Sequence, residues 1–268
     1  MKEIGVPRIL TLLTDFGLQD PYVGVMKGAI AQINPQIAAI DLTHDLPRQN
    51  LAAARFALMN AYPYFPDDTV HVAVVDPGVG GDRRAIALEL PQGFLVGPDN
   101  GIFSGILSQY PLIKAVELTN PDYWRSANPS TTFHGRDIFA PVGAHLANGV
   151  PIKQLGEAIV DPHTLVNLPL PFYTQEKPYI RGAIQSIDHF GNLITNIPGE
   201  AVNEVPWSVI LNEEIIVGAQ TYSDLPVGQA IALIGSHGWV EIAVNCGNAE
   251  KELKLTWGDP VQLLIYTE

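Results

Sequence analysis

The sequence predicts an α/β protein, with an N-terminal α/β layered domain built on a mostly parallel sheet and a small C-terminal β barrel. Two observations lead to this prediction. Short apolar runs alternate with segments of helical periodicity up to about residue 165, which is typical of a layered α/β domain. Beyond that point, strand-like segments follow one another between closely spaced turn residues, which is typical of a small barrel or sandwich.

Strands in the first half are predicted where a short apolar run ends at a turn. Residues 8–14 lead into Asp15-Phe16-Gly17, and residues 70–75 lead into Asp76-Pro77-Gly78. The strands predicted in this half are residues 8–14, 37–42, 70–75, 85–90 and 94–96, of which the last two form a hairpin.

Helices in the first half are predicted from apolar residues at helical spacing. Asn50 is expected to cap one helix with its side chain, and Gly149 to end another. The predicted helices are residues 22–33, 50–62, 103–108 and 137–148.

A proline-rich segment, residues 168–178, is predicted to be a linker, since it carries Pro169, Pro171 and Pro178. We therefore expect an N-terminal domain over residues 1–170 and a C-terminal domain over residues 179–268. The strands predicted in the second domain are residues 179–188, 193–197, 208–211, 214–217, 230–234, 239–244 and 261–265.

The composition argues against several classes of function. The chain of 268 residues is 47% hydrophobic and 16% charged, as in globular proteins. Its net charge of −13 argues against nucleic acid and anionic membrane surfaces as partners. No apolar run reaches membrane-spanning length, and the first residues lack the apolar stretch of a signal peptide. Cys246 is the single cysteine, so no intrachain disulfide can form and a cytoplasmic location is expected.

Three acidic turn motifs follow predicted strands: Asp15-Phe16-Gly17, Asp76-Pro77-Gly78 and Asp99-Asn100-Gly101. In an open α/β sheet, ligands bind beyond the carboxyl ends of the strands. A carboxylate in that place can accept hydrogen bonds from sugar hydroxyls. Taken singly, however, each motif is better explained as ordinary turn chemistry.

The motifs predict neither a nicotinamide cofactor nor a catalytic metal. Gly78-Val79-Gly80 begins like a dinucleotide-binding loop, but the full pattern needs glycine at position 83, where the chain has Arg83. The histidines at positions 44, 71, 134 and 189 lack the paired spacing of a metal site.

Other polar motifs are equally ambiguous on their own. His134 precedes a predicted helix, where it is typical of a capping or core residue, and Arg136 with Asp137 is typical of a structural ion pair at a helix start. Residues 186–192 and 235–238 each join two predicted strands and could be hairpin loops with polar tips.

Taken together and in order, these motifs resemble the family of S-adenosylmethionine hydroxide adenosyltransferases, adenosine-forming hydrolases related to fluorinating and chlorinating enzymes. The matching segments span nearly the whole chain: 14–17 with Asp20 and Tyr22, 75–80 with Arg83 and Arg84, 97–101, 132–137, 188–192 and 236–249. The resemblance implies the same two-domain fold. It also implies a homotrimer, in which the substrate S-adenosyl-L-methionine lies between the N-terminal domain of one subunit and the C-terminal domain of the next.

The resemblance implies that Asp76, Arg83 and His134 aim a water molecule at C5′ of the substrate. The substrate is a sulfonium, so its leaving group departs as a neutral thioether and needs no general acid. The water, a poor nucleophile, must be held in line with the C5′–S bond. Arg83 would stabilise hydroxide character on it, and Asp76 or His134 would orient it and take its proton. The sequence leaves open which of the three is the base.

By the same resemblance, Asp15 would bind the ribose hydroxyls, with Asp20 nearby, and Phe133 would line the region of the ribose and C5′. Gln49 would be part of the same pocket. It stands where the halogenating branch of the family has an aromatic residue that covers the substrate.

The substrate-binding residues implied in the C-terminal domain are Asp188, Phe190, Asn192, Ser236 and Cys246. Asp188 would face the ammonium group of the substrate and Ser236 its carboxylate. Asn192 would hydrogen-bond adenine, with Phe190 beside it and the backbone near Cys246 helping. His237 stands where the halogenating branch has arginine, so carboxylate recognition would rest on Ser236 and backbone donors.

Alternative functions differ in what they require of these residues. A halogenase needs a halide pocket, but Asp76 stands where the halogenating branch has tyrosine and Gly135 where it has serine. An ionised Asp76 would repel halide, so hydrolysis is favoured over halogenation. A non-catalytic adenosine or S-adenosylmethionine binder would tolerate loss of Arg83 or His134. A purely structural interpretation treats Asp76 and Arg83 as a turn ion pair, which would contribute little if exposed.

Overall fold

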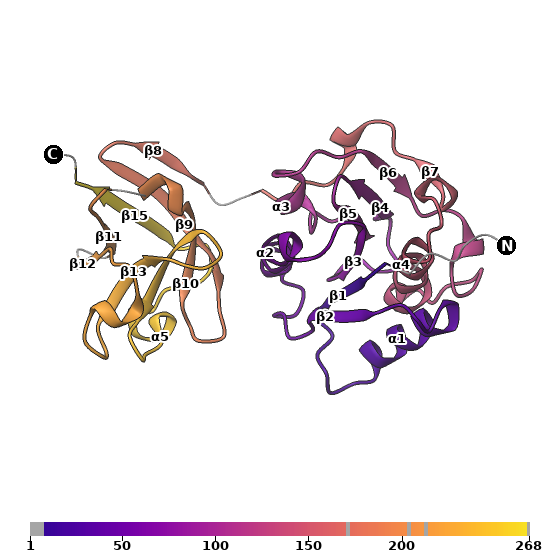
Figure 1. The fold of residues 1–268 in the computed structure, drawn as a ribbon, viewed down its shortest axis with the longest axis horizontal. Coiled ribbons are helices and arrows are strands. Elements are labelled where there is room, and N and C mark those ends of the chain that lie inside the picture. Colours follow the sequence, from indigo (N-terminus) through magenta and orange to yellow (C-terminus); the bar gives the residue numbers. More distant parts are fainter. Residues whose placement is uncertain (1–7, 170–171, 203–204, 212–213, 267–268) are drawn as a thin grey trace. The chain divides into compact units, whose positions relative to one another are not determined.

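The structure of the protein is a computed structural model, and it describes residues 8–169, 172–202, 205–211 and 214–266. The chain forms two compact units, Met1–Leu168 and Pro169–Glu268 (Figure 1). They are called the N-terminal and the C-terminal unit below, and each is described by itself.

Among its described residues, the N-terminal unit has one seven-stranded sheet in the order β2-β1-β3-β5-β4-β6-β7. Neighbours pair in parallel from β2 to β5 and antiparallel from β5 to β7. Five strands (β1, β2, β3, β5 and β6) therefore point the same way, which confirms a mostly parallel sheet. The strands are β1 (Leu10–Thr14), β2 (Ala39–Thr43), β3 (Thr69–Val74), β4 (Ala85–Leu90), β5 (Gly93–Pro98), β6 (Lys114–Glu117) and β7 (Glu157–Ala158).

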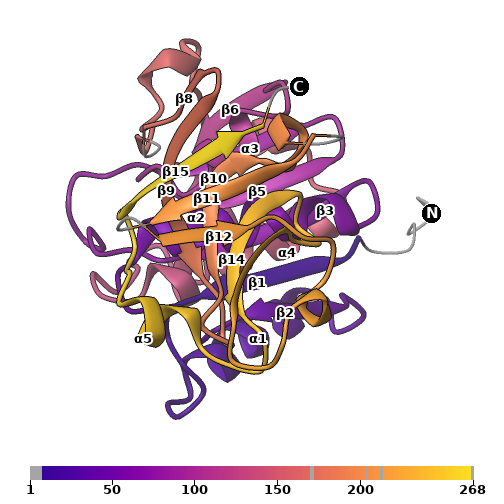
Figure 2. The same ribbon diagram turned by 90° about the vertical axis from the view of Figure 1, so that its left-hand side faces the viewer.

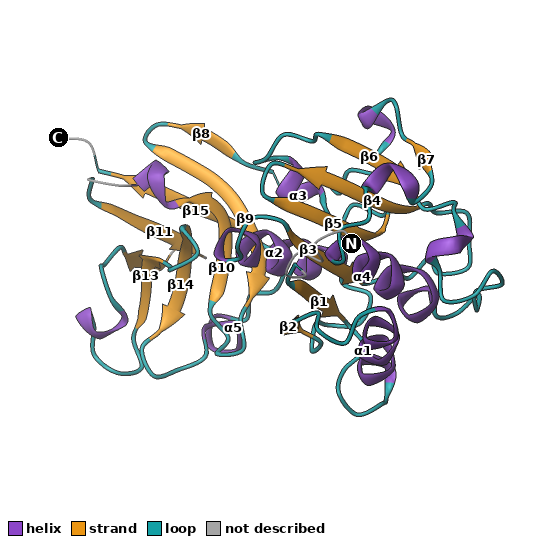
Figure 3. Ribbon diagram, turned by 45° about the vertical axis from the view of Figure 1, so that its right-hand side comes forward, coloured by secondary structure: helices purple, strands orange, loops and turns teal. Residues whose placement is uncertain are grey.

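Helices lie on both sides of this sheet (Figure 3). Helix α1 (Tyr22–Ile33) packs against α4 (Ala140–Ala147), and α2 (Leu51–Ala61) packs against α3 (Ser104–Leu107). The predicted cap of α2 is confirmed, because Asn50 Oδ1 accepts the Ala53 N–H at 2.9 Å. A π-helical turn, η3 (Gly135–Phe139), precedes α4. The described part of the chain contains no helix that is long and apolar enough to cross a membrane.

The parallel strands β1 and β3 set the place of the functional site. Both are buried along their whole length, as apolar strands covered on two faces must be. Their register pairs Thr14 with Val74 at the last position. Asp15 and Asp76 therefore leave the sheet at the same edge.

The C-terminal unit is an antiparallel sheet that curls into a nearly closed barrel, which confirms the predicted fold class (Figure 2). The strand order is β12-β11-β15-β9-β10-β14-β13, and a bridge between Gly218 and Ala232 brings the region after β12 to β13. The strands are β8 (Thr174–Glu176), β9 (Tyr179–Ile187), β10 (Leu193–Pro198), β11 (Trp207–Leu211), β12 (Glu214–Val217), β13 (Ala230–Ile234), β14 (Trp239–Val244) and β15 (Pro260–Ile265).

Three strands and one α-helix of the described residues were not predicted from the sequence. Strand β8 lies in the segment expected to be a linker and pairs with β9, so that expectation was wrong for residues 174–176. Its three residues are all exposed and polar, which leaves no apolar pattern to read. Strand β6 has four residues and pairs with β4 and β7, and β7 is a two-residue strand at the edge of the sheet. Helix α5 (Ala249–Leu253) buries only Ala249.

Candidate active site

A cavity of about 140 Å³ lies beside the turns that follow β1 and β3. Five residues expected at the site line it: Asp15, Gln49, Asp76, Phe133 and His134. The volume is below the roughly 300–1,000 Å³ of sites that enclose a drug-sized ligand. The cavity can therefore hold only part of such a ligand.

Asp76, Arg83 and His134 form one connected group, called the Asp–Arg–His group below. Arg83 Nε donates to Asp76 Oδ1 at 3.0 Å, and Arg83 Nη2 donates to Asp76 Oδ2. The same Nη2 lies 2.7 Å from His134 Nδ1. Only 11% of the Arg83 side chain and 5% of the Asp76 side chain are exposed, so this is not a surface ion pair.

The contact with Arg83 fixes the tautomer of His134. An arginine side chain has only donors, so His134 Nδ1 must be the acceptor and carries no proton. The neutral ring then holds its proton on Nε2. Burial and the charge of Arg83 lower the pKa of His134, while Asp76 and Asp137 act in the opposite direction. His134 is therefore neutral near pH 7 and presents an N–H donor on the side of the ring away from Arg83.

The turn after β3 is packed against the loop that carries His134. Gly80 has a φ of +77°, and a Cβ at this position would lie 2.3 Å from the carbonyl oxygen of Thr131. Only glycine combines this conformation with so close a backbone approach. Gly80 thus allows the turn that carries Asp76 to pack closely against the loop that carries His134, although the two are far apart in the sequence.

Asp15 is held by the segment that follows β2. The Gln49 N–H donates to Asp15 Oδ2 at 2.7 Å, from a residue with the unusual φ of +62°. The carbonyl of His44 accepts the Gly17 N–H at 2.8 Å, and His44 Nδ1 lies 2.8 Å from Thr14 Oγ1. Both flanks of Asp15 are thereby fixed. Among the described residues nothing donates to Asp15 Oδ1, which remains available to a ligand.

An aromatic cluster forms another wall of the cavity. The Phe133 ring packs edge-on against Phe16 and Tyr22, with ring centroids 5.8 and 5.3 Å apart. A Cβ on Gly135 would lie 3.4 Å from both phenylalanine rings, so a larger residue would crowd this wall. Asp20 is exposed and does not line the cavity, so the structure does not bring it to the other predicted site residues.

Asp99, in the third acidic turn, has a structural role. Its side chain is 4% exposed and binds Arg84 through Oδ2, with Nε and Nη2 at 2.9 and 2.6 Å. Asp99 Oδ1 accepts the Val166 N–H at 2.9 Å. Asp99 does not line the cavity. The ordinary turn interpretation is right for this motif.

In the C-terminal unit, Asp188 organises its own loop. Its Oδ1 accepts the N–H groups of Phe190 and Asn192, and its Oδ2 accepts Asn192 Nδ2, all at 2.9 Å. Asn192 is 7% exposed, whereas the Phe190 ring is 73% exposed. The loop therefore offers a largely exposed aromatic ring, which contacts His189 edge-on, beside a buried amide.

The turn that carries Cys246 lies against this loop. The Glu250 N–H donates to the Gly191 carbonyl at 2.9 Å, and the side chain of Asn248 fills the place of a Cβ on Gly191. Cys246 is exposed and has a φ of +57°. The turn that carries Cys246 thus packs against the loop that carries Asp188 and Asn192.

His237 is engaged within its own unit. Its Nδ1 accepts the Trp239 N–H at 3.1 Å, so Nε2 carries the ring proton and lies 3.1 Å from Glu241 Oε2. Tyr222 donates to Glu241 Oε1 at 2.7 Å, and burial with this hydrogen bond raises the pKa of Tyr222. The sequence analysis missed the buried carboxylate of Glu241. The neighbouring Ser236 is exposed.

No three His, Cys, Asp or Glu side chains are grouped as metal ligands anywhere in the described ranges. The Arg136–Asp137 ion pair predicted at the helix start is confirmed, at 2.6 Å.

Comparison with known proteins gives matches over both units. The N-terminal domain model of SAM hydroxide adenosyltransferases matches residues 10–156, and the C-terminal domain model matches residues 182–262. The chain is 41% identical over 255 residues to the (R)-S-adenosyl-L-methionine hydrolase of Salinispora tropica, covering 95% of this chain and 97% of that protein. It is 42% identical over 263 residues to the protein of the same name from Thermus thermophilus, covering 96% and 100%.

A more distant relative and a solved structure also match the chain over most of its length. A fluorinase of an Actinoplanes species is 25% identical over 271 residues, covering 88% of this chain and 91% of that protein. A crystal structure of an uncharacterized conserved protein from Thermotoga maritima superposes with a TM-score of 0.89 at 34% identity, covering 95% and 99% of the two chains.

Proposed function

This chain belongs to the family of SAM hydroxide adenosyltransferases, and from that premise we propose that it hydrolyses S-adenosyl-L-methionine to adenosine and L-methionine. Relatives named as hydrolases of this substrate are 34–42% identical to it over most of the chain. The observation that carries the proposal is the buried Asp–Arg–His group at the edge of a cavity that is also lined by Asp15.

The Asp–Arg–His group holds the attacking water. The Nε2–H of His134 donates to the water oxygen, and Asp76 accepts one of its protons, so the remaining lone pair points at C5′. Arg83 fixes both partners and supplies positive charge beside the oxygen as it gains anionic character. Because the free nitrogen of His134 already bears a proton, Asp76 is the first acceptor of the proton from water.

The reaction is a single displacement at C5′. The C5′–O bond forms while the C5′–S bond breaks, and the bonding pair leaves with sulfur as a neutral thioether. The proton passes from water to Asp76 and then to solvent, so each turnover releases one proton. The charge of the sulfonium is lost during the reaction, which an enclosed and weakly solvating cavity favours.

The remaining contacts follow the family assignment. Asp15 Oδ1 accepts hydrogen bonds from the ribose hydroxyls, and Phe133 packs beside the sugar. In the C-terminal unit, Phe190 stacks near adenine and Asn192 hydrogen-bonds it, with the backbone at Cys246 helping. The exposed Phe190 ring supports this proposal, since it has 73% of its surface available. Asp188 faces the ammonium group and Ser236 the carboxylate.

Because the cavity of about 140 Å³ holds only part of such a substrate, the site needs a second wall. We infer a homotrimer in which the C-terminal unit of a neighbouring subunit supplies the adenine and methionine contacts. The single cysteine supports a cytoplasmic location.

Halogenation is disfavoured by the same site. Asp76 lines the cavity, and in the proposed reaction its carboxylate lies beside the nucleophile, where a fixed negative charge repels halide. The fluorinase matches are also more distant, at 22–25% identity. The related hydrolases are named for the R epimer at sulfur, and we propose the same preference here.

The test is a chromatographic product assay on the purified protein with each sulfur epimer of the substrate, in buffers with and without chloride or fluoride. We expect adenosine and methionine in equal amounts, the R epimer being consumed faster. The Asp76→Asn variant should be inactive. Formation of 5′-halo-5′-deoxyadenosine, or tight binding without turnover, would show that the proposal is wrong.

A further inference from the structure

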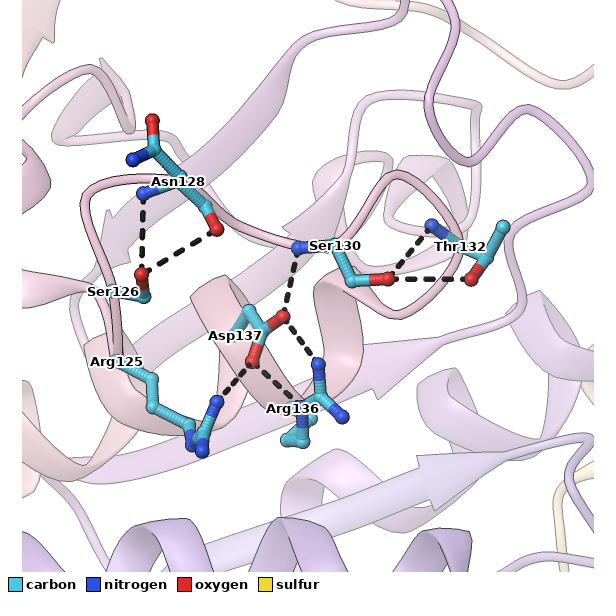
Figure 4. A network of polar contacts seen from close by, with 7 residues as sticks. All are labelled: Arg125, Ser126, Asn128, Ser130, Thr132, Arg136 and Asp137. Carbon is cyan, nitrogen blue, oxygen red and sulfur yellow. Dashed lines mark hydrogen bonds and ion pairs between the residues drawn. The ribbon is translucent and has the colours of Figure 1, made fainter.

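Asp137 is a buried carboxylate at the base of the loop that carries His134 (Figure 4). Its side chain is 2% exposed and accepts four hydrogen bonds. Arg136 donates two of them, both at 2.6 Å. Arg125 donates a third at 3.2 Å, and the backbone N–H of Ser130 a fourth at 2.9 Å. These bonds lower the pKa of Asp137 to about 2, that from Arg136 most of all, so it is ionised at any working pH.

The backbone of Asp137 ties the same loop. Its carbonyl accepts the Arg125 N–H at 2.9 Å, and its N–H donates to the Phe133 carbonyl at 3.2 Å. Side chain and backbone of one residue thus hold the beginning, the middle and the end of residues 125–133. Figure 4 shows the loop running from Arg125 past Ser130 to Thr132, with the Asp137 carboxylate inside it.

Two chains of contacts connect the Asp137 carboxylate to residues that line the cavity. The first runs through Ser130, whose Oγ accepts the Thr132 N–H at 3.3 Å, and Thr132 lines the cavity. The second runs through Arg136, whose guanidinium lies over the Phe133 ring at 5.1 Å from its centroid. Asp137 therefore orients the Phe133 side chain and the segment that leads into His134.

Asp137 also acts on His134 through its charge. The charged groups that act on this imidazole are Arg83 and Asp76 from the turn after β3, and Asp137 from its own π-helical turn. Burial and Arg83 lower the pKa of His134, and the two carboxylates raise it. Arg136 forms an ion pair with Asp137 and so neutralises part of the negative charge that Asp137 exerts on His134.

We propose that Asp137 is a positioning residue for the hydrolysis, which anchors the 125–134 loop so that His134 meets Arg83 and Phe133 faces the ribose. This inference rests on the proposed function. It assigns a catalytic consequence to a residue that the sequence alone describes as half of a structural ion pair.

The chain offers a matched control in Asp99. That carboxylate is similarly buried, binds a neighbouring arginine through Nε and Nη2, and accepts one backbone N–H. Neither carboxylate lines the cavity, but the loop tied by Asp137 leads to Thr132 and His134, which do, whereas the partners of Asp99 do not. If Asp137 served only the stability of the unit, Asp137→Asn and Asp99→Asn would have the same consequences.

The experiment compares these two variants with the wild type in kcat, KM and pH profile, at a temperature well below the unfolding of each. We expect Asp137→Asn to lower kcat at least about 10-fold, since small displacements of a catalytic group are costly. The acid limb of its pH profile should move to lower pH, because a charge that raises the pKa of His134 is removed. Asp99→Asn should leave kcat and the acid limb unchanged.

A second variant, Arg136→Gln, keeps the Asp137 carboxylate and removes its main counter-ion. It should move the acid limb in the opposite direction, to higher pH, and it tests the proposal if Asp137→Asn does not fold. Equal kcat and equal acid limbs in all variants would overturn the proposal.

NMR titration of His134 in the same variants reports its pKa without any turnover. A wild type that makes no adenosine would therefore refute the proposed function while Asp137 remained testable.

Discussion

At the scale of single residues, the site depends on the geometry of one guanidinium. Arg83 spans Asp76 with Nε and Nη2 and reaches His134 with the same Nη2. The planar fork is what allows one side chain to fix a carboxylate and the tautomer of an imidazole together. A lysine has a single ammonium group and cannot reproduce this arrangement.

The variant Arg83→Lys keeps the positive charge and removes the fork. We expect kcat to fall by about 100-fold, within the range found for loss of a preorganised donor, with normal folding. The matched control is Arg84→Lys, since Arg84 binds Asp99 and Thr164 outside the cavity. Steady-state kinetics of both variants checks the prediction, and an Arg83→Lys enzyme of wild-type kcat would refute the role given to the fork.

A second residue-scale feature is the buried histidine of β3. His71 is 1% exposed and bonds Thr11 Oγ1 through Nδ1 at 2.9 Å, and burial lowers its pKa to about 4. The folded state thus favours the neutral ring more than the unfolded state does, where the pKa is near 6.5.

Its contribution to stability is therefore complete above pH 6.5 and is lost as the pH falls toward 4. Over this interval the free energy of unfolding should decrease by about 3 kcal/mol from His71 alone. Denaturant titrations between pH 7 and 4 measure this slope. In His71→Gln the slope should be smaller by that amount, and an unchanged slope would show that His71 does not titrate on unfolding.

Part of the site could be placed from the sequence, because two of its acidic motifs stand at strand ends, whereas the roles of its residues came from the family resemblance. Asp15 and Asp76 follow apolar runs directly, so their shared edge of the sheet was predictable. The engagement of His237 with Glu241 was not, because it depends on which way a loop side chain turns. The four-fold ligation of Asp137 was also beyond a reading of sequence, since Arg125 and Ser130 lie outside its motif.

At the scale of elements, two loops meet at the site, and Gly80 is where one packs closely against the other. The turn after β3 carries Asp76, and the loop before the π-helical turn carries His134. The backbone of Gly80 lies so near the Thr131 carbonyl that a Cβ on Gly80 would be 2.3 Å from its oxygen. The π-helical turn follows directly after His134, and such turns are frequent at functional sites.

Gly80→Ala should therefore reduce both stability and turnover. The positive φ alone costs roughly 1–2 kcal/mol for a residue with a Cβ, and the clash with Thr131 must also displace the loop that leads to His134. Gly149→Ala is the matched control, since Gly149 has a φ of +87° and open space around its Cβ position. It should lower the melting temperature without lowering kcat, and equal kcat in both variants would contradict this coupling.

The elements that could be predicted are those with a clear hydrophobic pattern. The predicted helix over residues 22–33 agrees with α1 in both bounds, and the hairpin of β4 and β5 is present. The polar β8 and the short β6 and β7 gave no such pattern, because strands of three, four and two residues are too short to show a hydrophobic periodicity. The π-helical turn was not predicted either, because its hydrophobic spacing is that of an ordinary helix start.

At the scale of the whole molecule, the proposal divides the active site between two units. The proposed catalytic residues lie in the N-terminal unit and the proposed adenine contacts in the C-terminal unit. Composition and periodicity predicted both folds, because each unit has its own core. They could not predict assembly, which depends on the surfaces of two copies.

Complementation between inactive variants tests the trimer. Asp76→Asn disables the first unit and Asn192→Ala the second, so each should be inactive when expressed alone. If each site combines units of two neighbouring subunits, co-expression should restore up to about a quarter of wild-type activity. With equal and random mixing, that fraction of the sites receives an intact N-terminal unit from one variant and an intact C-terminal unit from the other. No restoration in mixed trimers, or a monomer by light scattering, would contradict shared sites.

In the proposed reaction, a water held by Asp76, Arg83 and His134 attacks C5′ of S-adenosyl-L-methionine. The most direct measurement is turnover in water labelled with oxygen-18, with mass spectrometry of both products. We predict one heavy oxygen in adenosine, at the 5′ position, and none in methionine, with product formation lost in Asp76→Asn. Unlabelled adenosine, label in methionine, or a halogenated nucleoside as the first product would contradict the account.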